Sequence, residues 1–278
     1  MRKRKQRRKF NFVLLLAFSF CFVFMATAYS ILSESLTVSG SATITQKEVS
    51  GGDFIESVVG DDDSFVENDD GSHNFVGDEG VAVNNYIEFP EGNSTLWRII
   101  SIDVDGNIKI IRDPEASLNS LFMANNKDNY NWETSVVLQN LKNWYQQNFS
   151  AYSDIIVQNP EWQLTTVPKN TPLMDPPTVF GVYTDSPIGL IRNDEILNSS
   201  GSGSSSDKNI SSWVNQGYQW TMTAISDKPN QAWKVNGGKF MNSGVASSST
   251  VYRPVIYLKS SVTFSGGTGT EDDPFVVS

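Results

Sequence analysis

The longest stretch without a charged residue lies near the N-terminus, where residues 10–32 are mostly apolar. Its centre, Phe12 to Ala26, carries no charge and only Ser19 and Cys21 as mildly polar positions. Seven basic residues and no acid precede it: Arg2, Lys3, Arg4, Lys5, Arg7, Arg8 and Lys9. A basic flank followed by an apolar run is typical of a secretory signal, and Ala26 and Ala28 supply the small residues of a cleavage site. The pattern predicts that the chain is exported.

Two fates of residues 1–32 stay open. Cleavage after Ala28 would release the chain outside the cell as a secreted protein. Without cleavage, the hydrophobic helix would cross the membrane through residues 10–32, because about 20 apolar residues span a bilayer. The basic flank would then remain in the cytoplasm and the rest of the chain would lie outside. The segment is therefore a signal peptide or an N-terminal membrane anchor.

The next two segments differ in polarity. Residues 33–47 alternate apolar and polar positions around Gly40, which predicts a short strand segment. Residues 48–80 contain eleven acids and no basic residue. High charge with few large apolar residues predicts an acidic, solvated spacer, with His73 as a solvated linker residue. The alternative is a calcium site, because aspartates bind calcium. No other cofactor is expected.

Residues 81–278 have the pattern of a globular domain. Strand patterns cover 83–89, 95–104, 107–112, 178–183, 217–223, 251–258 and 262–265. Asp105-Gly106 separates two of them, as in a hairpin turn. Thr134 to Phe149 places apolar residues three and four apart, which predicts an amphipathic helix capped by Thr134 or Ser135. Pro254 indicates an edge position or the start of a strand.

The net charge and the counts of cysteine and histidine exclude several classes of partner and metal site. The formal net charge is −10 even with the basic N-terminus included, so nucleic acid is an unfavourable partner. The chain has one cysteine and one histidine, which excludes an internal disulfide, a thiolate zinc site and a multi-histidine metal centre.

Several phrases resemble a largely uncharacterised domain of exported surface proteins in Gram-positive bacteria. They are LWRII at 96–100, IIRD at 110–113, IGLI at 188–191, YQWTMT at 218–223, YRPVIYLK at 252–259 and GGTGTEDDPF at 266–275. The resemblance covers about 70% of the chain, a share set by residues 83–278. It implies a fold distantly similar to the C-type-lectin-like fold, which formylglycine-generating enzymes share. The activity of those enzymes is not implied, because it needs cysteines that this domain lacks.

The expected fold class is therefore α+β. A twisted mixed or antiparallel sheet would carry one main amphipathic helix and long loops, preceded by the hydrophobic N-terminal helix. Arg98, Arg112 and Arg253 lie in apolar strand settings, where pairing with acids inside the fold is favoured over ligand binding.

Two functions follow. The first is a non-catalytic, lectin-like binding or scaffolding domain at the cell surface, with a cell-wall or extracellular glycan or protein as partner. Trp132, Trp162 and Trp233 lie in or near predicted loops, which makes them candidate sugar-stacking residues, although tryptophan more often anchors a core. The alternative is a secreted hydrolase acting on glycans or the cell wall, which needs two carboxylates in a cleft. Glu133, Glu161, Asp194 and Glu195 are its candidate acids. No catalytic residue is assigned, and an enzyme is the less favoured interpretation.

Overall fold

The computed structural model describes residues 49–89, 96–113, 118–125, 129–172, 176–201, 209–215, 217–246 and 249–278. The predicted signal or anchor, with Ala26 and Ala28, and the predicted strand at 33–47 lie outside these residues. No helix among the described residues is long and apolar enough to cross a membrane. The described part is rich in strands and has three α-helices, which agrees with the expected mixture of β-sheet and helix.

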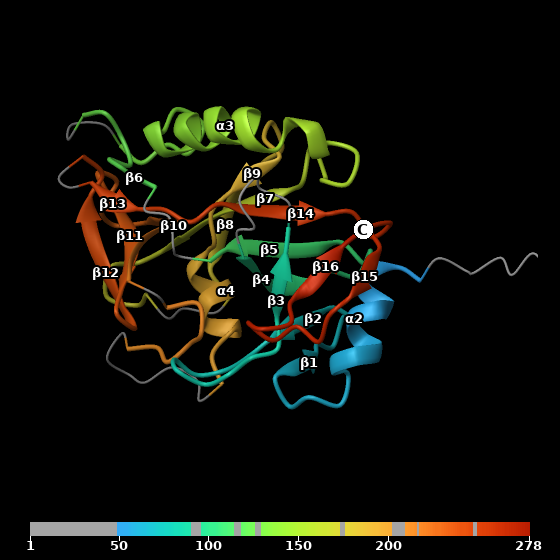
Figure 1. Ribbon diagram of the computed structural model, residues 1–278. Helices are drawn as coiled ribbons and strands as arrows, with labels where there is room; N and C mark the ends of the chain where they lie inside the picture. Colours follow the sequence, from blue (N-terminus) through green and yellow to red (C-terminus); the bar gives the residue numbers. More distant parts are fainter. Residues whose placement is uncertain are drawn as a thin grey trace, which may run out of the picture. The chain divides into compact units, whose positions relative to one another are not determined.

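The larger sheet has nine strands (Figure 1). Seven follow the order β15-β16-β3-β4-β5-β14-β9; β2 pairs with β4, and β1 pairs with β2. The sheet is mixed, because β16 and β3 are parallel and the other pairs are antiparallel. The strands are β1 (Phe65–Glu67), β2 (His73–Phe75), β3 (Tyr86–Glu88), β4 (Leu96–Ile102), β5 (Ile108–Arg112), β9 (Ile188–Gly189), β14 (Val255–Leu258), β15 (Phe264–Gly266) and β16 (Phe275–Val277).

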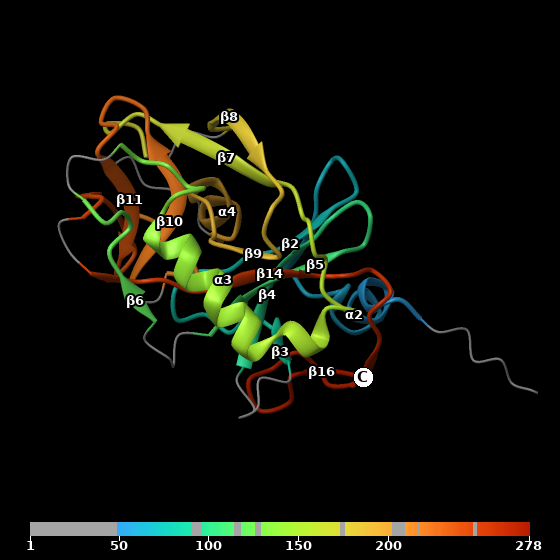
Figure 2. The same cartoon turned by 90° about the horizontal axis from the view of Figure 1, so that it is seen from above.

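A second sheet has five strands in the order β12-β11-β10-β7-β8, with β7 and β10 parallel. In both views β11 lies at one end of the folded unit and helix α2 (Gly51–Val59) at the other (Figures 1 and 2). The strands are β7 (Trp162–Val167), β8 (Thr178–Tyr183), β10 (Tyr218–Ile225), β11 (Gln231–Asn236) and β12 (Lys239–Gly244). A short pair joins β6 (Asn119–Ser120) to β13 (Thr250–Val251).

The predicted hairpin at Asp105-Gly106 is confirmed as the β4–β5 turn. Gly106 has a φ of 79°, a value that glycine adopts without steric cost. The Asp103 carboxylate accepts hydrogen bonds from the backbone N–H groups of Asp105 and Asn107. The turn therefore follows from local side-chain chemistry, which is why the sequence pattern was enough to find it.

The predicted amphipathic helix is also confirmed, as α3 (Val136–Asn148). The Ser135 hydroxyl caps it by accepting a hydrogen bond from the Leu138 N–H at 3.0 Å. Figure 2 shows α3 crossing β14, β4 and β3, and in Figure 1 it covers one face of the larger sheet. Phe149, just after the helix, packs edge-on against Trp97 of β4 with ring centres 5.6 Å apart. A short 3-10 helix (Ser150–Tyr152) follows.

The predicted acidic spacer at 48–80 is wrong for the residues that the structure describes. Residues 49–80 form helix α2 (Gly51–Val59) and the β1–β2 hairpin, and they belong to the same compact unit as the rest of the fold. Three apolar side chains fix them: Ile55 and Phe75 are fully buried, and Phe65 packs on Phe75 at 5.0 Å. His73 lies in β2 and stacks on Phe65 at 4.6 Å. Burial of these few apolar side chains is enough to fold the segment, although most of its other residues are polar or acidic.

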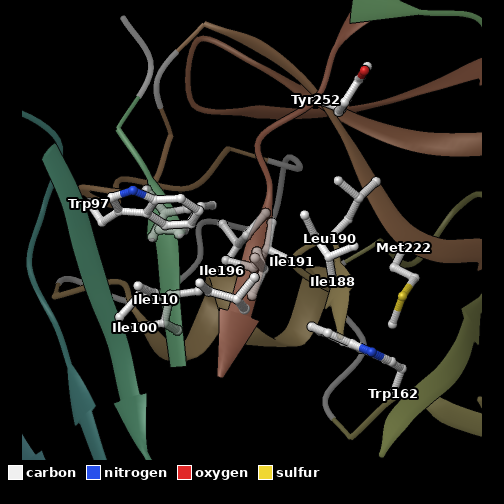
Figure 3. Close-up of a cluster of buried hydrophobic side chains, with 14 of the residues drawn as sticks. Trp97, Ile100, Ile110, Trp162, Ile188, Leu190, Ile191, Ile196, Met222 and Tyr252 are labelled. Carbon is white, nitrogen blue, oxygen red and sulfur yellow. The ribbon is translucent and has the colours of Figure 1, made fainter. Parts of the chain in front are cut away.

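Pro254 lies immediately before β14, in agreement with the second of its two predicted roles, the start of a strand. Residues 252–254 divide the predicted strand 251–258 into β13 and β14. Strand β14 lies between β5 and β9, so it is an interior strand and not an edge. It runs through the centre of a large apolar core, where Ile110, Ile188 and Ile191 gather around it (Figure 3).

Candidate functional site

A polar cleft of about 460 Å³ lies between the β1–β2 hairpin, the end of β4, the start of β7 and helix α4 (Asn193–Asn198). Its polar lining is made of carboxylates, amides, hydroxyls and one guanidinium: Asn68, Asp70, Ser72, Asn74, Ser101, Asp103, Glu161, Gln163, Arg192, Glu195, Asn198 and Tyr257. These groups come from segments far apart in the sequence. The fold thus collects hydrogen-bonding side chains into one concave surface.

A buried ion network forms one wall of the cleft. Lys109 of β5 is almost fully buried, and its ammonium donates to Glu195 Oε1. The Arg192 guanidinium lies 3.5 Å from the same carboxylate oxygen. Arg192 also donates to Asp194 through Nη2 at 2.7 Å and through Nε at 3.1 Å. Two cations and two anions therefore neutralise one another inside the fold.

The start of helix α4 positions Glu195. The Glu195 side chain reaches back to accept the Arg192 backbone N–H at 2.9 Å, which satisfies one of the free donors at a helix N-terminus. The helix packs on β10, where Asn193 N–H donates to Thr223 Oγ1 and Thr221 Oγ1 donates to Asn193 Oδ1. Glu195 is held both by its own backbone and by Lys109, so its orientation is fixed.

The network also fixes the protonation state of Glu195. Burial alone would raise the pKa of this carboxyl, but the cations of Arg192 and Lys109 outweigh it, and the pKa lies below its ordinary value. Burial likewise opposes the charge of Lys109, yet the Glu195 carboxylate outweighs it and the pKa of Lys109 is raised. Glu195 is therefore a carboxylate at neutral pH and holds no proton to donate as a general acid.

Of the four candidate acids, the cleft brings two together. Glu161 and Glu195 line it, and Glu161 is exposed. Asp194 is buried and bonded to Arg192. Glu133 is exposed just before α3 and does not line the cleft.

The expectation that loop tryptophans stack on sugars is contradicted by their burial. Trp132, Trp162 and Trp233 are exposed by 1%, 1% and 0%. Trp162 donates its indole N–H to the Ser186 carbonyl at 2.8 Å, and its ring lies beside Ile188 and Met222 (Figure 3). All three rings belong to the hydrophobic core, because burying such large apolar surfaces stabilises the fold more than solvating them.

The predicted pairing of strand arginines with acids is confirmed for Arg253. Its Nη2 lies 3.9 Å from Asp113 Oδ1, while Nε and Nη1 donate to the carbonyls of Arg112 and Val214. The Arg112 guanidinium lies 5.3 Å from the Trp144 ring centre. No carboxylate of the described residues lies within 4 Å of the Arg98 guanidinium.

Lys109 and Arg192 were not identified from the sequence, although one signal was present. Lys109 interrupts an apolar strand, Ile108 to Ile111, where a lysine needs a buried counter-charge. The part of the chain that the structure describes has no group of three or more His, Cys, Asp or Glu side chains placed to hold a metal ion. Calcium binding by the acidic segment stays a prediction.

Comparison of the chain with protein-family models, with curated proteins and with solved structures found no match.

Proposed function

We propose that the folded part of this chain is a non-catalytic binding module of an exported cell-surface protein, and that its polar cleft binds a cell-wall or extracellular glycan. The N-terminal segment would carry the module out of the cell, either anchored through residues 10–32 or released after Ala28. We also propose that the fold, built on a twisted mixed sheet, is distantly similar to the C-type-lectin-like fold, as the motif resemblance implies.

One observation carries the proposal: the cleft is lined by many hydrogen-bonding side chains, among them Glu195, which Lys109 and Arg192 hold as a carboxylate. A glycan offers hydroxyl groups that both donate and accept. Fixed carboxylates and amides bind such hydroxyls without reorganising, which lowers the entropy cost of binding. Asp70, Asp103 and Glu161 add negative charge around the cleft, so neutral glycans and amino sugars suit it better than acidic ones.

The hydrolase alternative has one observation in its favour, which is that Glu161 and Glu195 line the same cleft. A glycosidase needs one carboxyl that is protonated at working pH. Lys109 and Arg192 keep Glu195 ionised, so Glu161 would have to serve as the acid. Glu161 is exposed to solvent, whereas a glycosidase acid lies in an enclosed cleft. The binding function is therefore the better supported of the two.

A glycan array probed with the full chain in mild detergent, with and without calcium, tests the proposal. We expect binding to neutral or amino-sugar glycans. Replacing the exposed Gln163 and Asn198 by alanine should weaken binding about tenfold, the loss of one or two hydrogen bonds. Glu133→Gln, outside the cleft, is the matched control and should change nothing.

Two outcomes would overturn the proposal. The first is glycan binding that the cleft variants leave unchanged. The second is release of new reducing ends from a bound glycan that Glu161→Gln abolishes, which would establish the hydrolase. The export part is tested separately by mass spectrometry of the N-terminus: a chain starting at Tyr29 in the medium indicates release, and an intact N-terminus in the membrane fraction indicates anchoring.

A further inference from the structure

A second pocket, of about 330 Å³, lies between the Glu79–Asn84 segment, strands β3 and β4, and residues Thr270 and Glu271. Arg98 of β4 forms part of its inner wall and is only 3% exposed. The pocket is separate in its lining residues from the cleft around Glu195. It contains a feature that the proposed function does not use, a buried guanidinium without a close counter-charge among the described residues.

Neighbouring side chains hold Arg98 rigidly. The rings of Tyr86 and Trp213 each lie 4.3 Å from the guanidinium carbon, so both are placed for cation–π contact. Nε donates to Asn85 Oδ1 at 2.8 Å, and Asn85 is in turn anchored because its Nδ2 donates to the Ile99 carbonyl at 2.7 Å. Nη2 makes only a long hydrogen bond, 3.4 Å, to the Val83 carbonyl. The planar, forked guanidinium of Arg98 is therefore held in one orientation, and its outer nitrogen Nη2 is only weakly hydrogen-bonded.

The charge of Arg98 is not neutralised by a salt bridge within the described residues, in contrast to Lys109 and Arg192. Burial, the largest influence, lowers the pKa of Arg98 in agreement with this environment. A planar guanidinium that is buried, oriented and without a carboxylate partner is suited to receive the carboxylate of a ligand.

The outer part of the pocket has the opposite charge. Glu79 and Glu271 are both exposed, and both line the pocket. Val81, Ala82 and Val83 give the lining an apolar part as well. The pocket is therefore positive at its inner wall, apolar along one side and negative at its rim. Rim acids would repel a simple anion but attract the cationic end of a ligand that carries both charges.

We propose that this pocket binds a small zwitterion, an amino acid or related amino-carboxylate. The ligand's carboxylate would accept from the Arg98 guanidinium, and its ammonium group would lie toward Glu79 and Glu271. The carbon chain between them would contact Val81 to Val83. The pocket volume falls at the small end of the range for small-molecule sites, in keeping with a ligand of this size.

Isothermal titration calorimetry on the full chain in mild detergent tests this. The probes are L-alanine, β-alanine and γ-aminobutyrate, which space the two charges differently, with acetate and ethylammonium as single-charge controls. We expect at least one zwitterion to bind with a dissociation constant of about 1 mM or lower, and both controls to bind at least about tenfold more weakly.

Variants locate the site. The double substitution Glu79→Gln and Glu271→Gln changes only exposed side chains, so folding should be unaffected, and zwitterion affinity should fall about tenfold. Glu67→Gln, an exposed acid outside the pocket, is the matched control and should leave affinity unchanged. Arg98→Lys keeps the charge and removes the fork; if it remains folded by thermal melting, it should also bind about tenfold more weakly.

Three results would overturn the inference: no binding of any zwitterion at about 50 mM, acetate binding as tightly as the zwitterions, or zwitterion binding that the rim double variant leaves intact. Because the glycan test uses different residues and probes, failure here leaves the proposed function of the cleft standing, and the reverse also holds.

Discussion

Buried positive charge is stabilised in different ways at two sites of the fold. Beside the polar cleft, Lys109 and Arg192 are matched by the carboxylates of Glu195 and Asp194. In the second pocket, Arg98 is enclosed by the rings of Tyr86 and Trp213 and by amide and carbonyl acceptors. In the first arrangement, carboxylates of the protein neutralise the buried cations. The second holds the cation against two rings, with no carboxylate of the described residues within 4 Å of it.

The physical cost of disturbing the two sites should differ. Removing one partner of a buried ion network leaves an uncompensated charge, which is strongly destabilising. Removing a cation that is held by ring faces leaves no opposite charge behind, only lost contacts and an unsatisfied amide. Substitutions at each site therefore measure how far the two arrangements differ.

The largest effect is expected for Glu195→Gln. It leaves Lys109 and Arg192 buried with too little negative charge, and we expect a loss of about 3–5 kcal/mol in the free energy of unfolding. Urea denaturation followed by tryptophan fluorescence measures this. Glu161→Gln, in the same cleft but exposed, is the control and should leave the midpoint unchanged. A loss below about 1 kcal/mol for Glu195→Gln would show that the network does not carry the stability assigned to it.

A smaller loss, about 1–3 kcal/mol, is expected for Arg98→Met. Methionine fills much of the same space, so the loss comes from the cation–π contacts and the hydrogen bond to Asn85. The same denaturation experiment applies. If Arg98→Met costs more than Glu195→Gln, the contrast between the two sites is wrong.

Lowering the pH should produce a further, smaller difference in stability between the Glu195 and Arg98 variants. The pKa of Glu195 is lowered in the folded state, so its ionisation stabilises the fold above the ordinary value of 4.5, and this contribution is lost as pH falls through the folded pKa. The stability difference between wild type and Glu195→Gln should shrink below pH 4.5. For Arg98→Met the difference should change less over the same range, because Asp113 and Glu271 act on the Arg98 guanidinium only at longer range, without a salt bridge. Denaturation midpoints measured from pH 7 downward in matched buffers check both trends.

The surface pair between Lys142 and Asp185 gives the smallest expected effect. Its atoms are 3.2 Å apart, but the Asp185 side chain is 90% exposed, so solvent screens the attraction. Asp185→Asn should cost about 0.5 kcal/mol or less. A double-mutant cycle with Lys142→Met isolates the coupling. A value above about 1 kcal/mol would mean that exposure is a poor guide to the strength of ion pairs in this protein.

The parts of the fold that the sequence predicted correctly depend on interactions between residues close together in the chain. The β4–β5 turn depends on Asp103 and Gly106, and helix α3 on Ser135 and the apolar spacing behind it. All of these signals lie within a few residues of one another. The segment 49–80 was mispredicted because its composition is acidic, whereas its structure depends on the positions of Ile55, Phe65 and Phe75.

The candidate site was less predictable because its residues meet only through the tertiary fold. Lys109 and Glu195 are 86 positions apart, and no spacing rule joins them. Glu195 appeared among the candidate acids, but its role depends on two cations brought by β5 and by the residue before α4. The tryptophans show the opposite problem, since their position in loop-rich sequence suggested exposure while their size favoured burial.

The packing of residues 49–80 determines how far the chain can be truncated from its N-terminal side without losing contacts of the folded unit. A recombinant fragment starting at Val81 would remove β2 from its place beside β4, and with it the Phe54 ring that contacts both Phe264 and Phe275. That fragment would expose apolar surface in water and tend to aggregate. A cut placed ahead of Ser50, whose hydroxyl caps α2, preserves those contacts, so soluble expression depends on keeping the acidic stretch.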